Sequence, residues 1–266
     1  MRKDRYSFED LLEVMKILRS ENGCPWDREQ THDSLKRYLI EETYEVLEAI
    51  DKKSKDMLCE ELGDLLLQIV FHAQIAEENG EFDINDVITG ISKKMYDRHT
   101  HVFGEDKAET AQDVVNNWEV IKRKEKRIET YTEDLRKIAP NLPALMRSYK
   151  VQQKAAKAGF DWNDIKDVID KVYEEINELN SAREAQDIEK VSEELGDLLF
   201  SVVNVSRFLN VHPELALNAT VEKFINRFEY IEKTVSKEGR KLENLSLKEM
   251  NLLWDDAKTH IFKKKD

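Results

Sequence analysis

The sequence EELGDLL occurs twice in this chain, at 60–66 and at 193–199. When the first half is shifted by 133 residues, four of its acidic residues fall on four acidic residues of the second half. The matched acids are Glu42, Glu45, Glu61 and Asp64 in the first half and Glu175, Glu178, Glu194 and Asp197 in the second. Small changes of offset pair Trp26 with Trp162 and Trp118 with Trp254. The sequence therefore predicts a tandem duplication of one domain.

Apolar residues recur at intervals of three and four, and sustained alternation of apolar and polar residues is rare. With only 8 Gly and 4 Pro in 266 residues, this pattern predicts an all-α fold. Ser7 followed by Asp10 predicts a capping box that opens the first helix. Residues 127–143 are charged, weakly periodic and rich in proline at their end, which is typical of a linker. We therefore expect domains at 1–126 and 144–266, joined by a linker at 127–143.

The composition limits the partners of the protein. Its net charge of −13 argues against nucleic acid or an anionic membrane as the main partner, although a local basic pocket remains compatible with it. Cys24 and Cys59 form neither a disulfide framework nor a zinc-ligand spacing, and no apolar run is long enough to span a bilayer. We expect a cytoplasmic protein, and the sequence does not indicate a protein regulator.

The repeated acids have the spacing of a metal site. In each half, E-E-x-x-E is followed by fifteen residues and then by E-x-x-D. Acids three residues apart share a helix face, so two antiparallel helices would bring four carboxylates together. Such a cluster repels itself unless a cation is bound, and oxygen ligands suit Mg²⁺ or Mn²⁺. The alternative is that the acids form a solvated helix face without a function.

A glycine lies between the two acids of each E-x-x-D pair, at Gly63 and Gly196. Glycine weakens a helix by about 1 kcal/mol relative to alanine. We expect these glycines to allow close approach of the facing helix or of a ligand. The alternative is a glycine that serves helix packing alone.

Basic residues are also repeated at helical spacing. Lys94 and Arg98 correspond to Lys223 and Arg227, and W-x-x-x-K occurs in both halves, as Trp118 with Lys122 and Trp254 with Lys258. Such donors near a metal site would hold the oxygens of a polyphosphate, and a tryptophan could stack on a base. The alternative is surface ion pairing together with a core tryptophan. The histidines show no metal-ligand spacing that both halves share.

Taken together, these residues resemble the MazG family of nucleoside triphosphate pyrophosphohydrolases over nearly the whole chain. The stretches that carry the resemblance are GCPWDREQTHDSL, YLIEETYEVLEAI, EELGDLLLQIVFHAQ, HVFGE, LPALMRSYKVQQKAA, GFDW, KVYEEINEL and EELGDLLFSVVN. One departure is Thr100 in DRHTHVF, where the family more often has proline.

The resemblance implies an all-α fold, a homodimer that completes the helical bundles, and Mg²⁺-dependent hydrolysis of NTPs and dNTPs to nucleoside monophosphate and pyrophosphate, with Mn²⁺ as a substitute ion. It implies metal ligands at Glu175, Glu178, Glu194 and Asp197, and a second candidate metal site at Glu42, Glu45, Glu61 and Asp64. Those four ligands and Glu193 would be the catalytic acids, with Glu194 or Glu193 as the base. The implied nucleotide contacts are Lys171, Glu174, Glu175, Lys190, Glu193, Asp197, Lys223, Phe224, Arg227, Trp254 and Lys258.

The two halves differ where a nucleotide should lie. At the 133-residue offset the second half is the more basic and polar one, and the matched positions are Tyr38 and Lys171, Met57 and Lys190, and Phe71 and Asn204. We therefore expect the second half to carry most of the hydrolysis, and the first half to be weaker, differently selective or regulatory. Two alternatives are a phosphohydrolase that releases phosphate from another metabolite, and a non-catalytic helical sensor of nucleotide or metal.

Overall fold

The computed structural model of the chain describes residues 3–125 and 128–262. Within these ranges every regular element is a helix, which confirms the predicted all-α fold. The chain divides into two compact units, Met1–Lys126 and Arg127–Asp266. The predicted boundary at 126–127 lies outside the described residues, and the domain limits 1–126 and 144–266 stay predictions. No helix in the described ranges is both long enough and apolar enough to cross a membrane.

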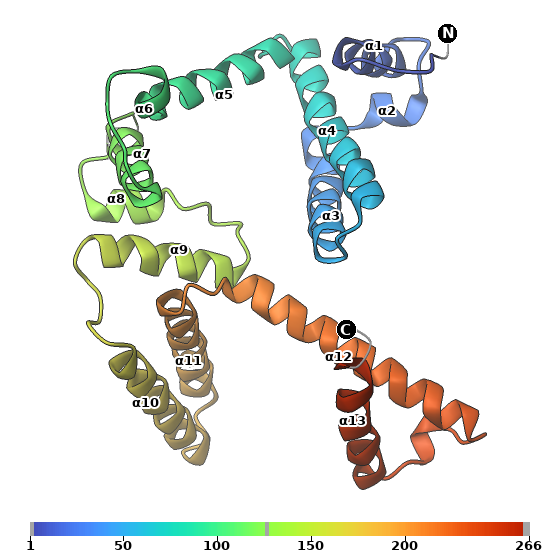
Figure 1. Ribbon diagram of the computed structural model, residues 1–266, viewed down its shortest axis with the longest axis vertical. Helices are drawn as coiled ribbons and strands as arrows, with labels where there is room; N and C mark the ends of the chain where they lie inside the picture. The colour runs from blue at the N-terminus through green and yellow to red at the C-terminus, as the bar shows by residue number, and fades with distance from the viewer. Residues whose placement is uncertain (1–2, 126–127, 263–266) are drawn as a thin grey trace. The chain divides into compact units, whose positions relative to one another are not determined.

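The first unit contains seven described helices (Figure 1). They are α1 (Phe8–Arg19), α2 (Pro25–Glu29), α3 (His32–Asp51), α4 (Lys55–Glu78), α5 (Ile84–Arg98), α6 (Thr100–Phe103) and α7 (Ala111–Glu125). The predicted capping box opens α1, because the Ser7 hydroxyl accepts from the Asp10 amide and the Asp10 carboxylate accepts from the Ser7 amide. The core lies where α1 and α3 pack on α4, and its buried residues are Met15, Leu35, Val70, Phe71 and Ile75.

The second unit repeats the long antiparallel pair and extends it (Figure 1). Its elements are α8 (Tyr131–Arg136), α9 (Ala144–Lys157), α10 (Ile165–Glu184), α11 (Ile188–Phe208), α12 (Pro213–Lys237), the 3₁₀ turn η1 (Leu242–Asn244) and α13 (Leu247–Phe262). Helix α11 packs against both α10 and α9, and α12 packs against α13. A second apolar cluster, with Ile231, Val235 and Leu245 buried, holds the α12–α13 hairpin together.

Backbone and side-chain details confirm the tandem repeat. A three-residue turn joins α3 to α4 and another joins α10 to α11, and each contains one non-glycine residue with positive φ, Lys53 at 53° and Gln186 at 57°. These two residues are 133 positions apart, the offset that matches the acids. The guanidinium of Arg98 lies 5.5 Å from the ring centre of Trp118, and that of Arg227 lies 5.3 Å from the ring centre of Trp254.

The segment expected to be a linker is structured in part. Residues 131–136 form α8, which packs on α9. Asp134 and Ile138 are buried, and Lys154 of α9 forms an ion pair with the Asp134 carboxylate and donates to its main-chain oxygen over 3.0 Å. This segment therefore belongs structurally to the second unit.

The prediction that a facing helix closely approaches the repeated glycines is wrong within one chain, and so is the alternative that they serve helix packing alone. A Cβ added at Gly63 or at Gly196 would meet no heavy atom of the described residues within 4 Å. Neither glycine therefore lies against a facing helix. Both leave an open surface beside the acids of α4 and α11.

Candidate active site

The first unit brings three of its four matched acids together. Glu42 and Glu45 on α3 and Glu61 on α4 each offer a carboxylate oxygen, and these oxygens lie within 4.8 Å of one another. Burial raises the pKa of Glu42, and the neighbouring charge of Asp64 raises it further. The acids therefore converge, as expected for an antiparallel helix pair, and their negative charges repel one another.

The second unit does the same at a more buried position. Oxygens of Glu175 on α10 and of Glu194 and Asp197 on α11 lie within 4.8 Å of one another. Glu175 is 4% exposed and Glu194 is 8% exposed. Glu178 is exposed and lies outside this group of three, yet its charge, after burial, raises the pKa of Glu194. Lys190, one turn before Glu194, acts in the opposite direction on that pKa.

Glu175 is only half satisfied. Lys171 Nζ lies 2.7 Å from its Oε1 and 2.8 Å from Oε1 of Glu174, and these two bonds, Glu174 first, raise the pKa of Lys171. The Oε2 atom of Glu175 is buried and has no hydrogen-bond partner among the described residues. Because an unpaired buried carboxylate oxygen is costly, this atom and the neighbouring acids fit a hard cation with oxygen ligands.

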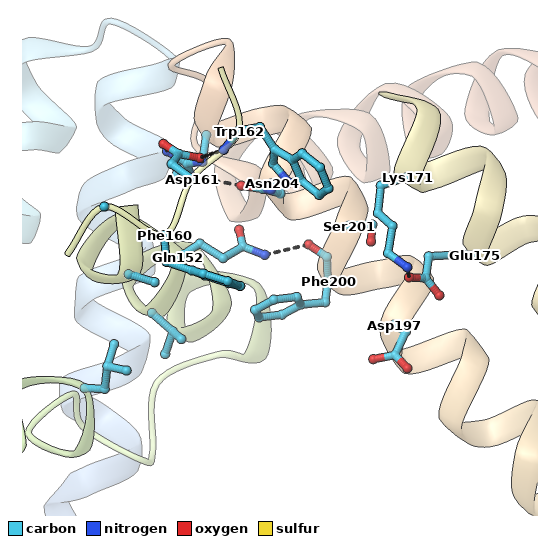
Figure 2. A pocket seen from close by; sticks show the side chains of 15 residues that line it. Gln152, Phe160, Asp161, Trp162, Lys171, Glu175, Asp197, Phe200, Ser201 and Asn204 are labelled. Carbon is cyan, nitrogen blue, oxygen red and sulfur yellow. Dashed lines mark hydrogen bonds and ion pairs between the residues drawn. The ribbon is translucent and has the colours of Figure 1, made fainter. Parts of the chain in front are cut away.

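A pocket of about 770 Å³ opens beside these acids (Figure 2). Lys171, Glu175 and Asp197 line one side of the pocket in Figure 2, and Gln152, Phe160 and Trp162 lie on the other side. The remaining lining residues are Leu135, Val151, Ala155, Gly159, Asp161, Phe200, Ser201, Asn204 and Arg207. A pocket of this size with an anionic side and an aromatic side can hold a nucleotide together with its metal.

Ion pairing fixes the loop between α9 and α10. Arg207 of α11 binds the Asp161 carboxylate, with Nη1 2.9 Å from Oδ2, and its Nε donates to Asn204 Oδ1 over 2.9 Å. Asp161 lies between Phe160 and Trp162, so the Arg207 bond anchors both aromatic residues beside the pocket. The aromatic side of the pocket is therefore preorganised by α11.

The basic and aromatic set of α12 and α13 lies elsewhere. Phe224 and Trp254 pack with their ring centres 5.0 Å apart, and Lys258 Nζ lies 2.8 Å from Asp255. The residues that line the pocket do not include Lys223, Phe224, Arg227, Trp254 or Lys258. Of the expected nucleotide contacts, the structure thus brings Lys171, Glu175 and Asp197 to the pocket of one chain. Glu174 lies on α10, and Lys190 and Glu193 lie on α11; these three residues are not among those that line the pocket.

Sequence reasoning missed several pocket residues, among them Gln152, Phe200 and Leu135. Gln152 gives no local signal, because a glutamine on a helix is usually solvated. The GFDW stretch offered a signal, since two exposed aromatic residues directly follow a glycine, and Gly159 has a φ of +88°.

Two residues that line the pocket of the second unit are matched in the first unit by aromatic residues of the core. Phe71, which matches Asn204, is buried in the core, and Tyr38, which matches Lys171, packs against that core. A smaller pocket of about 230 Å³ has lining residues from α1, α4 and the start of α5, and these do not include the acids of the first cluster. At these two positions the first half thus has aromatic side chains packed in its core where the second half has polar side chains that line a pocket.

The fold and the site together define a class of protein. It is an all-α protein whose paired helices carry clustered carboxylates, and in the second repeat these lie beside a pocket large enough for a nucleotide. The family model described as "MazG nucleotide pyrophosphohydrolase domain" matches residues 30–103 and again residues 163–231. The chain belongs to the MazG family. This membership confirms the resemblance, the tandem repeat and the expectation of an enzyme that hydrolyses a pyrophosphate bond.

Similar proteins occur in several bacteria. The chain is 48% identical to the "Nucleoside triphosphate pyrophosphohydrolase/pyrophosphatase MazG" of Thermotoga maritima, over 94% of this chain and 95% of that protein. It is 46% identical to the "Nucleoside triphosphate pyrophosphohydrolase" of Escherichia coli K12, over 93% and 95% of the two chains. It is 49% identical to "Uncharacterized protein YabN" of Bacillus subtilis, over 95% of this chain and 52% of that protein.

Proposed function

We propose that the chain hydrolyses nucleoside and deoxynucleoside triphosphates between the α- and β-phosphates, giving nucleoside monophosphate and pyrophosphate. The observation that carries the proposal is the buried acid cluster around the unpartnered Glu175 Oε2, at one side of a pocket of about 770 Å³. Relatives that align along most of the chain are named for nucleoside triphosphate pyrophosphohydrolase activity, which supports the substrate class.

Mg²⁺, with Mn²⁺ as a substitute, is the proposed cofactor. The residues that would hold it are Glu175, Glu178, Glu194 and Asp197. The donor set is made of carboxylates alone, which suits a hard divalent ion that retains positions for water and phosphate. When bound, such an ion offsets the charge of the triphosphate and makes bound water more acidic. In the first unit Glu42, Glu45, Glu61 and Asp64 form the second candidate metal site.

The remaining chemistry belongs to the side chains of the pocket. The oxygen of a water molecule forms a bond to the α-phosphorus while the bond from that phosphorus to the bridging oxygen breaks, and pyrophosphate leaves with the bridging oxygen. The proton of the water passes to a carboxylate. Glu194 suits this role better than Glu193, because Glu194 lies in the converging group and is buried, whereas Glu193 is exposed. The Lys171 ammonium orients Glu175.

The second half is proposed to carry most of the hydrolysis. Its acid cluster adjoins a pocket, and Lys171 and Asn204, which line it, are matched in the first half by the core-packed Tyr38 and Phe71. The first half keeps three converging carboxylates, so metal binding there without efficient turnover is the expected behaviour.

A homodimer is proposed to complete the site. Exposed apolar residues recur at helical spacing on one face of α11 and on one face of α12. On α11 they are Leu195, Leu199 and Val202, and on α12 they are Val221, Phe224, Ile225 and Phe228. A second chain that covers these faces would bury them. It would also offer a route by which the basic set of α12 and α13 reaches a nucleotide. Light scattering should therefore give twice the mass of one chain, and Leu199→Glu with Phe228→Glu should lower it to that of a monomer.

The test of the proposed function is product analysis with NTPs and dNTPs in the presence of Mg²⁺. Wild type is expected to release nucleoside monophosphate and pyrophosphate. Glu175→Gln should abolish release, and the matched Glu42→Gln should leave most of it. Release of free phosphate instead of pyrophosphate would overturn the cleavage site, and equal losses in the two variants would overturn the assignment to the second half.

A further inference from the structure

Gln152 lines the pocket on the side away from the acid cluster, on α9 (Figure 2). It is 7% exposed, and its Nε2 donates to the main-chain oxygen of Phe200 over 2.8 Å. This bond fixes the orientation of the carboxamide, because the reverse orientation would place two oxygens against each other. The Oε1 atom consequently points away from the Phe200 carbonyl. It is a buried acceptor without a hydrogen-bond partner among the described residues.

Three aromatic residues, Phe160, Trp162 and Phe200, line the same pocket as this acceptor. Phe160 and Trp162 line the same side of the pocket as Gln152, and Figure 2 shows the Gln152 carboxamide directed toward the main chain of Phe200. Phe160 is 86% exposed although it is anchored by its neighbour Asp161, so its ring is free to receive a flat partner. Stacking on aromatic rings is the usual way in which proteins hold a nucleobase, and small rotations of exposed rings commonly accompany binding.

On this basis we propose that Gln152 reads the base of the nucleotide by accepting a hydrogen bond from its exocyclic amino group. The inference rests on the proposed function, because it requires the triphosphate to lie at the acids of the same pocket. The base then stacks among Phe160, Trp162 and Phe200, and the amino group reaches Gln152 Oε1. A base with an oxo group at that position would place its oxygen against Gln152 Oε1, and neither acceptor would have a donor.

Two pairs of substrates isolate this contact. CTP and UTP differ at position 4 of the ring, and ATP and ITP differ at position 6, in each case by an amino donor against an oxo acceptor. Wild type is expected to prefer the amino member of each pair by about tenfold in kcat/KM, the effect typical of one buried hydrogen bond. Gln152→Met keeps the length of the side chain and removes the acceptor, so the preference should fall to within twofold.

Gln68→Met is the matched control. Gln68 on α4 of the first unit is also a buried glutamine, 6% exposed, whose Oε1 has no partner among the described residues, and it does not line the pocket. Its replacement should leave both preferences unchanged. Circular dichroism and the thermal midpoint of each variant show that it is folded. If Gln152→Met does not fold, Gln152→Asn provides the same test, since it withdraws the acceptor by one methylene.

Dissociation constants for the non-hydrolysable α,β-methylene analogues of CTP and UTP separate this inference from the proposed function. A wild-type preference for the amino analogue that Gln152→Met removes supports the inference. Equal affinity and equal kcat/KM for both members, or a preference that survives in Gln152→Met, overturns it and leaves the hydrolysis standing. Absence of turnover with a Gln152-dependent preference in binding overturns the proposed function alone.

Discussion

Lys171 Nζ lies 2.7 Å from Oε1 of Glu175, one helical turn further along α10, while Oε2 of the same carboxylate has no partner among the described residues. The lysine therefore balances part of the charge of a buried carboxylate that also faces Glu194 and Asp197. A bound cation would balance the rest.

Lys171→Met should lower the free energy of unfolding of the metal-free protein by about 1–3 kcal/mol, because the substitution leaves the buried Glu175 carboxylate without its ammonium partner. The partial exposure of the lysine keeps the loss within this range. Adding Mg²⁺ should restore most of the lost stability, since the cation takes over the charge balance. Chemical denaturation with and without Mg²⁺ measures both effects. A loss that Mg²⁺ leaves unchanged would contradict the proposed place of the metal.

The open surface at the repeated glycines leads to a second prediction. Gly196→Ala should raise the free energy of unfolding by about 1 kcal/mol, because alanine favours the helix and nothing described lies within 4 Å of the added Cβ. If a phosphate or a second chain occupies this surface in the working enzyme, kcat/KM should fall at the same time. Gly63→Ala, its counterpart in the first half, should give the same gain in stability with little loss of activity. A variant Gly196→Ala with full activity would show that the surface is unused.

The anchor of α8 can be tested separately. Asp134→Ala should cost about 1–2 kcal/mol, because it removes a buried partner of Lys154. It should also raise KM for nucleotides several-fold, since the neighbouring Leu135 lines the pocket. Glu229→Ala breaks the exposed pair with Lys233 in the same unit and should change the unfolding free energy by less than about 0.5 kcal/mol. Equal effects of the two substitutions would contradict a structural role for α8.

His32 and His72 give the first unit a dependence on pH. Their Nδ1 atoms lie 2.7 Å apart, and burial, followed by the charge of His32, lowers the pKa of His72. In the window between this lowered value and the unfolded value of about 6.5, the unfolded chain binds more protons than the folded one. The contribution of the neutral His72 to the free energy of unfolding is therefore fully present above pH 6.5, and it is lost as the pH falls through this window.

Thermal midpoints measured between pH 5 and pH 7.5 should show this loss, and His72→Gln should flatten the slope because glutamine does not titrate. The comparison is made at constant ionic strength, so that the carboxylates of both proteins contribute equally. A slope that is the same in wild type and in the variant would assign the dependence to other groups.

Much of the fold and part of the site follow from local pattern alone. The helical period and the fifteen-residue gap place Glu175, Glu194 and Asp197 on facing turns of an antiparallel pair, and the oxygens of these three residues do converge. Glu178 falls outside the converging three, whereas its counterpart Glu45 lies inside the three of the first half, so the three-residue spacing does not by itself decide which acids converge.

The pocket follows from tertiary packing instead. Gln152, Phe200 and Leu135 come from α9, α11 and α8, and their meeting depends on how these helices pack, which no local spacing encodes. The same reason applies to the basic set of α12 and α13. Its spacing was visible in the sequence, yet within one chain it packs on itself.

Helix α8 precedes the region matched by the second family domain, and its Leu135 lines the pocket of the second unit. The pocket of the second copy is therefore not built from the duplicated region alone. The segment between the two matched regions contributes side chains to the pocket of the second unit, so substitutions in this segment can change its substrate preference. A change of substrate preference in relatives with this architecture should be sought there as well as among the repeated motifs.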